Sequence, residues 1–173
     1  MSEGLNPMQA LAVEKVTLNV GVGTSGQELE NAKLLLKRLT TRTPATTYAR
    51  HRNPVFKLRK GDAIGAKVTL RKAPALELLN RAFDCVGRKL SAHSFDKRGN
   101  FAFGIREYID FPGMKYDPQI GMMGFELAVT VKRKGGARVL TRRRGKAQPR
   151  NKYSVKKQES MDFVKSMFNV ELV

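Results

Sequence analysis

The chain has 173 residues, 41% of them apolar, which suits a single domain, residues 1–173, built around one hydrophobic core. Its 33 Lys and Arg against 15 Asp and Glu give a formal net charge of +18, and charge repulsion of this size is best offset by a polyanionic partner. One cysteine and two histidines exclude an intrachain disulfide and a cysteine metal cage, and no apolar run approaches the ~20 residues that span a bilayer. This composition indicates a soluble intracellular protein without a membrane partner and weakens most interpretations as an enzyme. Together with the motifs described below, it leads us to expect a protein that is not an enzyme and holds no metal or cofactor.

In chain order, alternating apolar residues predict a first strand at 15–20, and leucines at spacings of three and four predict a helix at 28–41. The turn between them reads GVGTSG, residues 21–26. Residues 40–54 are polar and basic with no clear period, which favours an exposed loop. A second strand with strict alternation follows at 63–70.

Pro74 opens a second helix, whose apolar residues continue at spacings of three and four from Leu76 to Leu90. The elements expected after it are strands at 101–109 and 124–131, a basic arm at about 132–157 with a hairpin turn at Gly135–Gly136, a helix at 155–168 and a short strand at 170–173.

The predicted strands are half polar, whereas strands of a parallel sheet covered on both faces are almost continuously apolar. We therefore expect an α+β fold in which helices pack on one face of an antiparallel sheet, with a basic C-terminal arm or hairpin appended. The other face of the sheet would then be free to meet a partner.

The positive charge is concentrated in two blocks. Residues 32–72 contain 12 bases and one acid, and residues 128–157 contain 12 bases and no acid. A charge that served only solubility would be spread along the chain. The two blocks predict two surfaces that contact an anion, or one surface built from both.

Gly21, Gly23 and Gly26 spell G-x-G-x-x-G between a strand and a helix, the formal fingerprint of a dinucleotide-binding turn. That fingerprint also needs an acid about 20 residues further on, where this chain has threonines and Arg42. Three interpretations stay open: nucleotide binding, a plain strand-to-helix turn, and a site where amide N–H groups hold a phosphate of an RNA backbone.

Two further groups of residues have more than one interpretation. Phe101 and Phe103 alternate on a predicted strand, where they can belong to the core or serve as stacking platforms for bases. Glu107, Asp110 and Asp117 could form a metal cluster, although the proline and glycine between them favour ordinary capping of loops.

Four segments resemble one known family in order and spacing: KVTLNVGVG, TPATTYAR, FKLRKGDAIGAKVTLR and GNFAFGIREYIDFPGMKYDPQIGMMGFELAV. From about residue 13 to the C-terminus the chain resembles the 5S rRNA-binding family of large-subunit ribosomal protein five, in its archaeal form. Glu126 stands where that family usually has Asp, and Arg42 stands where its members often carry Gln.

The resemblance implies an RRM-like α+β fold and a structural role in the large ribosomal subunit, in the cytoplasm. It implies binding to 5S rRNA in the central protuberance, beside large-subunit rRNA and neighbouring large-subunit proteins. Carried onto this sequence, the surface for 5S rRNA comprises Asn19, Gly21, Gly23, Arg42, Lys67, Thr69 and Arg71.

The resemblance also implies two contacts outside the large subunit. Segment 111–121 is expected to lie on the side that bridges to a protein of the small-subunit head. The loop at about 42–60 is expected to face the elbow of P-site tRNA, led by Arg50, His51, Arg52, Asn53, Lys57, Arg59 and Lys60. The basic arm, which composition assigns to nucleic acid, presents Arg142, Arg143, Arg144, Lys146 and Arg150.

Two other functions remain as alternatives. A generic RNA-binding protein or RNA chaperone would bind many RNAs equally, so competition between 5S rRNA and other RNAs separates it from the ribosomal function. A nucleotide-binding enzyme would use the turn at Gly21–Gly26 and would be saturated by a nicotinamide cofactor in a titration.

Overall fold

Five antiparallel strands in the order β2-β3-β1-β6-β5 form the central sheet of the computed structural model, which describes residues 6–24, 26–136 and 154–173. The strands are β1 (Leu11–Gly21), β2 (Ala45–Tyr48), β3 (Ala63–Leu70), β5 (Phe101–Ile105) and β6 (Phe125–Arg133). The long strand β1 is central and pairs with β3 on one side and β6 on the other. The expected antiparallel α+β architecture is confirmed.

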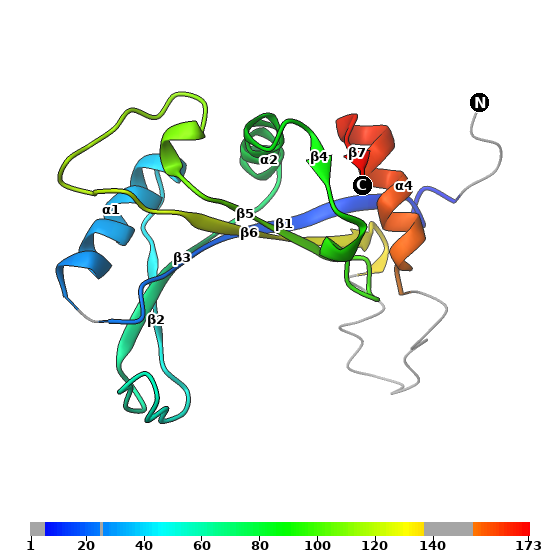
Figure 1. Ribbon diagram of the computed structural model, residues 1–173. Coiled ribbons are helices and arrows are strands. Elements are labelled where there is room, and N and C mark those ends of the chain that lie inside the picture. The colour runs from blue at the N-terminus through cyan, green and yellow to red at the C-terminus, as the bar shows by residue number, and fades with distance from the viewer. Residues whose placement is uncertain (1–5, 25, 137–153) are drawn as a thin grey trace.

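The helices α1 (Gln27–Thr40) and α2 (Ala73–Cys85) lie over one face of this sheet (Figure 1). The helix α4 (Lys157–Phe168) stands at the far end, next to a small parallel sheet of β4 (Lys89–Leu90) and β7 (Glu171–Leu172). Two short 3₁₀ turns, η1 (Ala92–Ser94) and η2 (Tyr108–Asp110), complete the described elements. Among the described residues, no helix covers the opposite face of the sheet.

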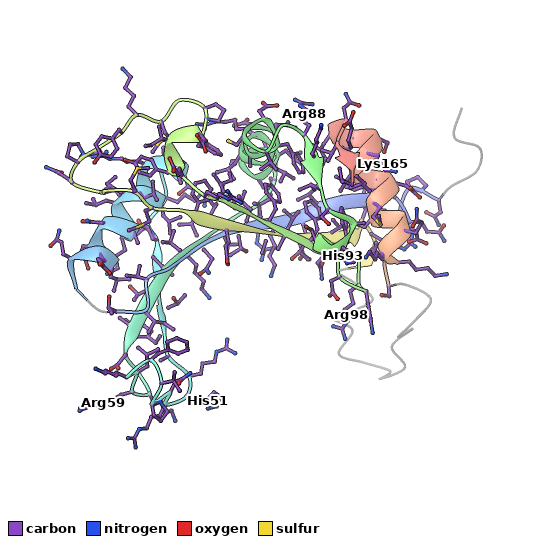
Figure 2. All side chains as sticks on the ribbon, in the orientation of Figure 1. His51, Arg59, Arg88, His93, Arg98 and Lys165 are labelled. Carbon is purple, nitrogen blue, oxygen red and sulfur yellow. The ribbon has the colours of Figure 1, made fainter. Side chains whose placement is uncertain are left out.

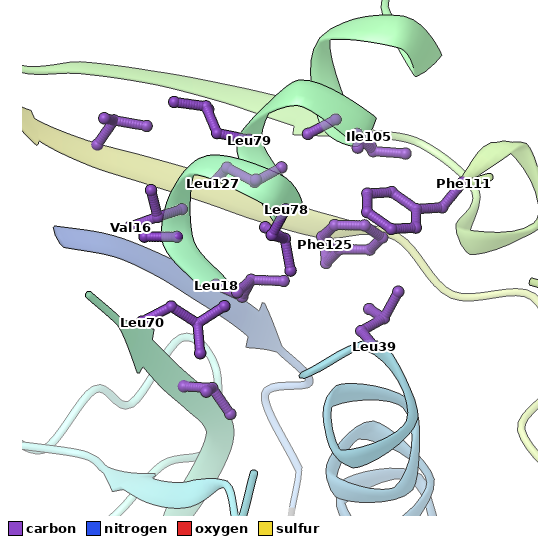
Figure 3. Packing of buried hydrophobic residues seen from close by; sticks show 14 of the residues in the cluster. Val16, Leu18, Leu39, Leu70, Leu78, Leu79, Ile105, Phe111, Phe125 and Leu127 are labelled. Carbon is purple, nitrogen blue, oxygen red and sulfur yellow. The ribbon is translucent and has the colours of Figure 1, made fainter. Parts of the chain in front are cut away.

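Alternation along the strands builds the core on the helix side. In β1, Val16, Leu18 and Val20 are buried while the residues between them are not. The leucines of α1 and α2 meet this layer, as Leu78 and Leu79 do in Figure 3. Burying each such leucine contributes about 1.5–3 kcal/mol, so packing rather than helix propensity holds α1 and α2 in place.

An aromatic group settles the interpretation of Phe101 and Phe103. The ring of Phe83 on α2 stacks on the Phe103 ring at 5.4 Å between centroids and on the Phe101 ring at 6.3 Å. Both strand residues therefore point toward the helices and belong to the core. The alternative that they stack on bases is wrong.

The second helix is shorter than its apolar spacing predicts. It ends at Cys85, because Gly87 and Arg88 adopt left-handed backbone angles, with φ of 62° and 55°. A helix cannot pass through such residues. Leu90 is buried, as its spacing indicates, but it lies in β4 rather than in the helix.

Other differences concern the ends of elements. The strand expected at 101–109 stops at Ile105 and is followed by η2, and β1 begins at Leu11, ahead of its predicted start. The short strand β2 was not predicted within the polar segment 40–54. The segment that should follow the hairpin turn expected at Gly135–Gly136 falls at 137–153, outside the described residues. The cations of the basic arm fall there too; they are Arg142, Arg143, Arg144, Lys146 and Arg150.

Candidate nucleic-acid interface

The uncovered face of the sheet is polar on the β1–β3 half. Strand register places Asn19 opposite Lys67 and Thr17 opposite Thr69. All four side chains point away from the helices, and the two threonine hydroxyls lie 3.4 Å apart. Lysine supplies positive charge here, while asparagine and threonine supply donors and acceptors for hydrogen bonds. The structure thus brings together three of the predicted rRNA-binding residues, Asn19, Lys67 and Thr69.

The β6–β5 half of the same face is built from small residues around one acid. Glu126 on β6 lies opposite Asn19 on one side and Gly104 on the other. A shallow hollow of about 480 Å³ opens here, lined by Asn19, Gly21, Gly104, Gly124 and Glu126 among others. The strands β1, β3, β5 and β6 place no aromatic side chain on the uncovered face, so RNA would not be held by the paired aromatic platforms of a typical RRM.

Three charged side chains meet at one edge of this face. A carboxylate oxygen of Glu14 lies 2.9 Å from Nζ of Lys132 and 3.5 Å from Nη1 of Arg71. The hydrogen bond from Lys132, with the charge of Arg71 nearby, holds the pKa of Glu14 below its ordinary value. The predicted contact residue Arg71 is exposed, but its guanidinium already pairs with the Glu14 carboxylate, which also binds Lys132.

The remaining predicted rRNA-binding residues lie at the margins. The turn at Gly23 meets the start of β3, where the N–H groups of Val22 and Gly23 both donate to the carbonyl of Ile64 at 2.9 Å. The amides of Val22 and Gly23 are therefore not free to bind a phosphate. For these two residues, the interpretation of the turn as a phosphate site is wrong. Arg42 is exposed beyond the end of α1 and precedes β2.

A projecting loop, defined here as residues 49–62, extends β2 and β3 away from the helices (Figure 1). At its base the N–H of Ala49 donates to the carbonyl of Asp62 at 2.8 Å. Nearer the tip, Asn53 and Leu58 exchange two backbone hydrogen bonds of 3.0 Å. The predicted exposed loop is thus an ordered hairpin with its own ladder.

The surface of the projecting loop is cationic and, at its tip, apolar. Its basic residues are exposed, and among the described residues none of them forms an ion pair; they are Arg50, Arg52, Lys57, Arg59 and Lys60. Figure 2 shows His51 and Arg59 pointing outward near the tip. Val55 and Phe56 between them are 84% and 70% exposed. Asn53 differs from the other predicted residues, because its Oδ1 accepts the N–H of Val55 at 3.1 Å and closes the turn.

Segment 111–121, the expected bridging side, lies beside α1. Its acid Asp117 forms an ion pair with Arg38 on α1 and accepts the N–H of Gln119 at 2.8 Å. The backbone hydrogen bond, followed by Arg38, lowers the pKa of Asp117. Asp117 therefore caps its own loop, as the proline and glycine around it predict, while Tyr116 and Met122 remain more than half exposed.

Metal and nucleotide sites find no support in the described residues. There, no group of three His, Cys, Asp or Glu side chains is placed to hold a metal ion. The glycine fingerprint needs a parallel βαβ unit, whereas β1 pairs antiparallel with both of its neighbours. Among the described helices, none is long and apolar enough to cross a membrane.

Two functional candidates were missed at the level of sequence. Glu126 was noted only as a departure from the family pattern, because its place opposite Asn19 depends on strand register. Phe56 was missed because it stands within a basic run. The sequence did indicate its exposure, since the apolar pair between Pro54 and Lys57 lies in a cationic turn that has no core to bury it.

Two family models match the chain. The model described as "Ribosomal protein L5" matches residues 6–59, and that described as "ribosomal L5P family C-terminus" matches residues 63–163. The boundary between them falls in the projecting loop. Both parts contribute strands to the same sheet, since β1 and β2 precede the boundary and β3, β5 and β6 follow it.

Curated relatives match over nearly the whole chain. "Large ribosomal subunit protein uL5" of Sulfurisphaera tokodaii is 46% identical, with 99% of this chain and 97% of the relative covered. The protein of the same name from Thermoplasma acidophilum is 43% identical, with 98% and 99% covered. That of Picrophilus torridus is 42% identical, with 97% and 96% covered.

Proposed function

The chain belongs to the ribosomal protein L5 family, a family of structural proteins of the large ribosomal subunit, and on that premise we propose that its uncovered sheet face binds 5S rRNA in the central protuberance. The observation that carries the proposal is a polar face that none of the described helices covers, on which Asn19, Lys67 and Thr69 lie side by side. Its lysine, asparagine and threonine side chains offer positive charge and hydrogen-bonding groups that suit RNA.

The chemistry of this face favours irregular RNA over a duplex. Asn19 and Thr69 present short side chains that hydrogen-bond base edges and 2′-hydroxyl groups, which are accessible where bases are unpaired. Lys67 and Arg71 meet phosphates, and each neutralised phosphate releases counterions. Phosphate contacts supply affinity and position the protein on the RNA, while hydrogen bonds from the polar side chains to base edges supply specificity for one RNA.

The projecting loop is the element proposed to reach the elbow of P-site tRNA. Its cations have no acidic partner among the described residues, and its tip exposes Val55 and Phe56. A hollow of about 570 Å³ at the tip is lined by Arg52, Lys57 and Arg59. In this proposal these three charges surround a phosphate, while Phe56 offers a ring for a base.

Segment 111–121 is the proposed bridging surface toward a protein of the small-subunit head. Because Asp117 is engaged with Arg38, the groups left to meet such a partner are the exposed Tyr116, the exposed Met122 just after the segment, and the polar side chains around them. Aromatic and methionine side chains are enriched at protein interfaces. The basic arm is proposed to contact large-subunit rRNA beside neighbouring proteins.

Competition binding tests the proposal for 5S rRNA. Labelled archaeal 5S rRNA is bound to the full chain and challenged with unlabelled 5S rRNA, tRNA and an RNA duplex at two salt concentrations. Only 5S rRNA should displace the label at low concentration. Equal displacement by all three would identify a generic RNA-binding protein instead.

A variant pair locates the binding face in the same assay. Lys67→Ala should weaken binding and lower the slope of log affinity against log salt by about 0.7–0.9. Lys165→Ala removes an exposed lysine on α4, far from the projecting loop in Figure 2, and should change neither quantity. Equal effects of both variants would show that total charge, rather than this face, holds the RNA.

A further inference from the structure

We propose that Glu126 and Asn19 together read the Watson–Crick edge of one unpaired guanine in the bound RNA. This inference rests on the proposed function, because it concerns the face assigned to 5S rRNA. It adds a specificity-determining residue, Glu126, which the family resemblance does not place on the RNA surface.

The position of Glu126 is unusual for an acid. Its carboxylate stands on the uncovered face, beside Asn19 and two strands away from Lys67. It is exposed, and among the described residues it has neither an ion pair nor a hydrogen bond. The other acid on this face, Glu14, is held by Lys132 and Arg71. A free carboxylate repels the phosphates of any RNA that docks here, so it favours binding only where it meets N–H donors.

The glycines around Glu126 leave room for a base. A Cβ atom added at Gly21 or Gly104 would meet no atom of the protein within 4 Å, and neither residue has a positive φ. The fold itself does not require glycine at these places, and glycine inside a strand costs about 0.5–1 kcal/mol relative to alanine. Strand glycines of this kind often mark a close approach by a ligand. By contrast, a Cβ at Gly124 would lie 2.6 Å from the carbonyl oxygen of Arg106, so that glycine serves packing.

The donor pattern of guanine matches the two side chains. Guanine presents two adjacent donors, N1–H and the N2 amino group, which the two oxygens of a carboxylate accept side by side. Its O6 lies next to them and accepts an N–H from the Asn19 amide. Adenine and cytosine place an acceptor nitrogen beside their amino group, and uracil flanks its single N–H with two carbonyls, so each would set an acceptor against the carboxylate. The selection requires an unpaired guanine, since pairing uses the same edge.

The hollow can also hold the phosphate of the same nucleotide at its rim. Arg106, directly after β5, lines the hollow and is exposed. Its guanidinium is available to a phosphate while the base lies over Gly21 and Gly104. One nucleotide would then be bound at three points: two on the base edge and one on the backbone.

Interference mapping with inosine tests this inference. Inosine lacks the N2 amino group of guanosine, so it removes one of the two donors offered to Glu126. Archaeal 5S rRNA carrying inosine at random guanosine positions is partitioned by binding to the wild-type chain, to the Glu126→Gln variant and to a Glu77→Gln control. Glu77 is an exposed acid on α2 without an ion pair among the described residues.

The expected result is one unpaired guanosine at which inosine weakens binding by wild type and by Glu77→Gln about ten-fold. Glu126→Gln should bind unmodified RNA about ten-fold more weakly and show no interference at that position. The inference is overturned if Glu126→Gln binds as tightly as wild type, if inosine interferes equally with both, or if the loss appears only when Mg²⁺ is present, which would mean a cation site. Failure of wild type to prefer 5S rRNA would instead refute the proposed function.

Discussion

Arg71, the residue after β3, lies 3.5 Å from a carboxylate oxygen of Glu14 on β1. The same oxygen is 2.9 Å from Nζ of Lys132, so one acid holds two cations at the edge of the uncovered face. Together Glu14, Arg71 and Lys132 carry a net positive charge, and the two ion pairs hold the cationic side chains in place. Binding of a phosphate at this edge must compete with Glu14 for the same guanidinium.

Arg71→Ala is expected to weaken binding to 5S rRNA and to lower the salt slope by about one unit, because one phosphate contact is lost. The measurement is a titration at several salt concentrations, with Lys165→Ala as the control of equal charge change. An unchanged slope for Arg71→Ala would remove this residue from the RNA surface.

Glu14→Gln is expected to strengthen RNA binding, because Arg71 and Lys132 no longer share a carboxylate and both become available to phosphate. The same titration should give a tighter complex and a steeper salt slope than wild type. Weaker binding by this variant would mean that Glu14 positions the two cations rather than competing for them.

Glu14 also predicts a pH dependence of stability. Its pKa is lowered in the folded chain from its ordinary value of 4.5. The stabilisation is therefore complete above pH 4.5 and is lost as pH falls through the lower folded value. For a partly exposed pair we expect about 1 kcal/mol or less. Urea unfolding should show wild type more stable than Glu14→Gln at pH 7, with the difference shrinking as the pH falls below 4.5; a difference that grows in acid would contradict the assignment.

Phe56→Ala and Arg52→Ala are expected to leave binding to isolated 5S rRNA within two-fold of wild type, because the projecting loop lies beyond the sheet face. Retention of P-site tRNA on ribosomes carrying the variants should fall, by about ten-fold for Phe56→Ala if its ring stacks on a base. Met167→Ala, which shortens another exposed apolar side chain, serves as control. Equal losses in both assays would assign the loop to 5S rRNA.

Gly65 and Gly21 separate glycines that serve the fold from glycines that serve the ligand. A Cβ at Gly65 would lie 2.5 Å from the carbonyl oxygen of Val20, so Gly65→Ala should cost about 1–3 kcal/mol of stability. A Cβ at Gly21 would meet nothing, so Gly21→Ala should be at least as stable as wild type while binding 5S rRNA more weakly. Thermal unfolding and RNA titration of both variants check this; a destabilised Gly21→Ala would show that the turn, not the ligand, needs glycine.

Local patterns predicted much of the fold. The strand at 63–70 and the helix beginning near residue 28 were found because alternation and three–four spacing depend only on neighbouring residues. The strand β2 was missed, since its four residues, ATTY, have no apolar alternation and form a strand only by pairing with β3. The end of α2 was misplaced, because Leu90 continues the helical spacing although the chain has already turned at Gly87.

The candidate site could be predicted only in part, because it too depends on pairing between strands that are distant in the sequence. The family resemblance assigned Asn19 and Thr69 to the RNA surface, and their strands place both side chains on the uncovered face. The role of Glu14 as partner of Arg71 and the place of Glu126 beside Gly104 depend on register between strands far apart in sequence. Register follows from the assembled sheet, and a single sequence does not specify which residues face one another.

Binding of 5S rRNA on the uncovered sheet face is tested most directly by cleavage of the RNA from a chelated iron tethered to single cysteines. In a Cys85→Ser background, which removes the one native thiol, Ala128→Cys places the iron on the uncovered face, at an exposed position opposite Thr17 that is not one of the assigned RNA contacts, and Lys165→Cys places it on α4. Strong, localised cleavage is expected from position 128 and little from position 165. Cleavage from position 165 as strong as that from position 128, or stronger, would show that RNA binds elsewhere on the protein.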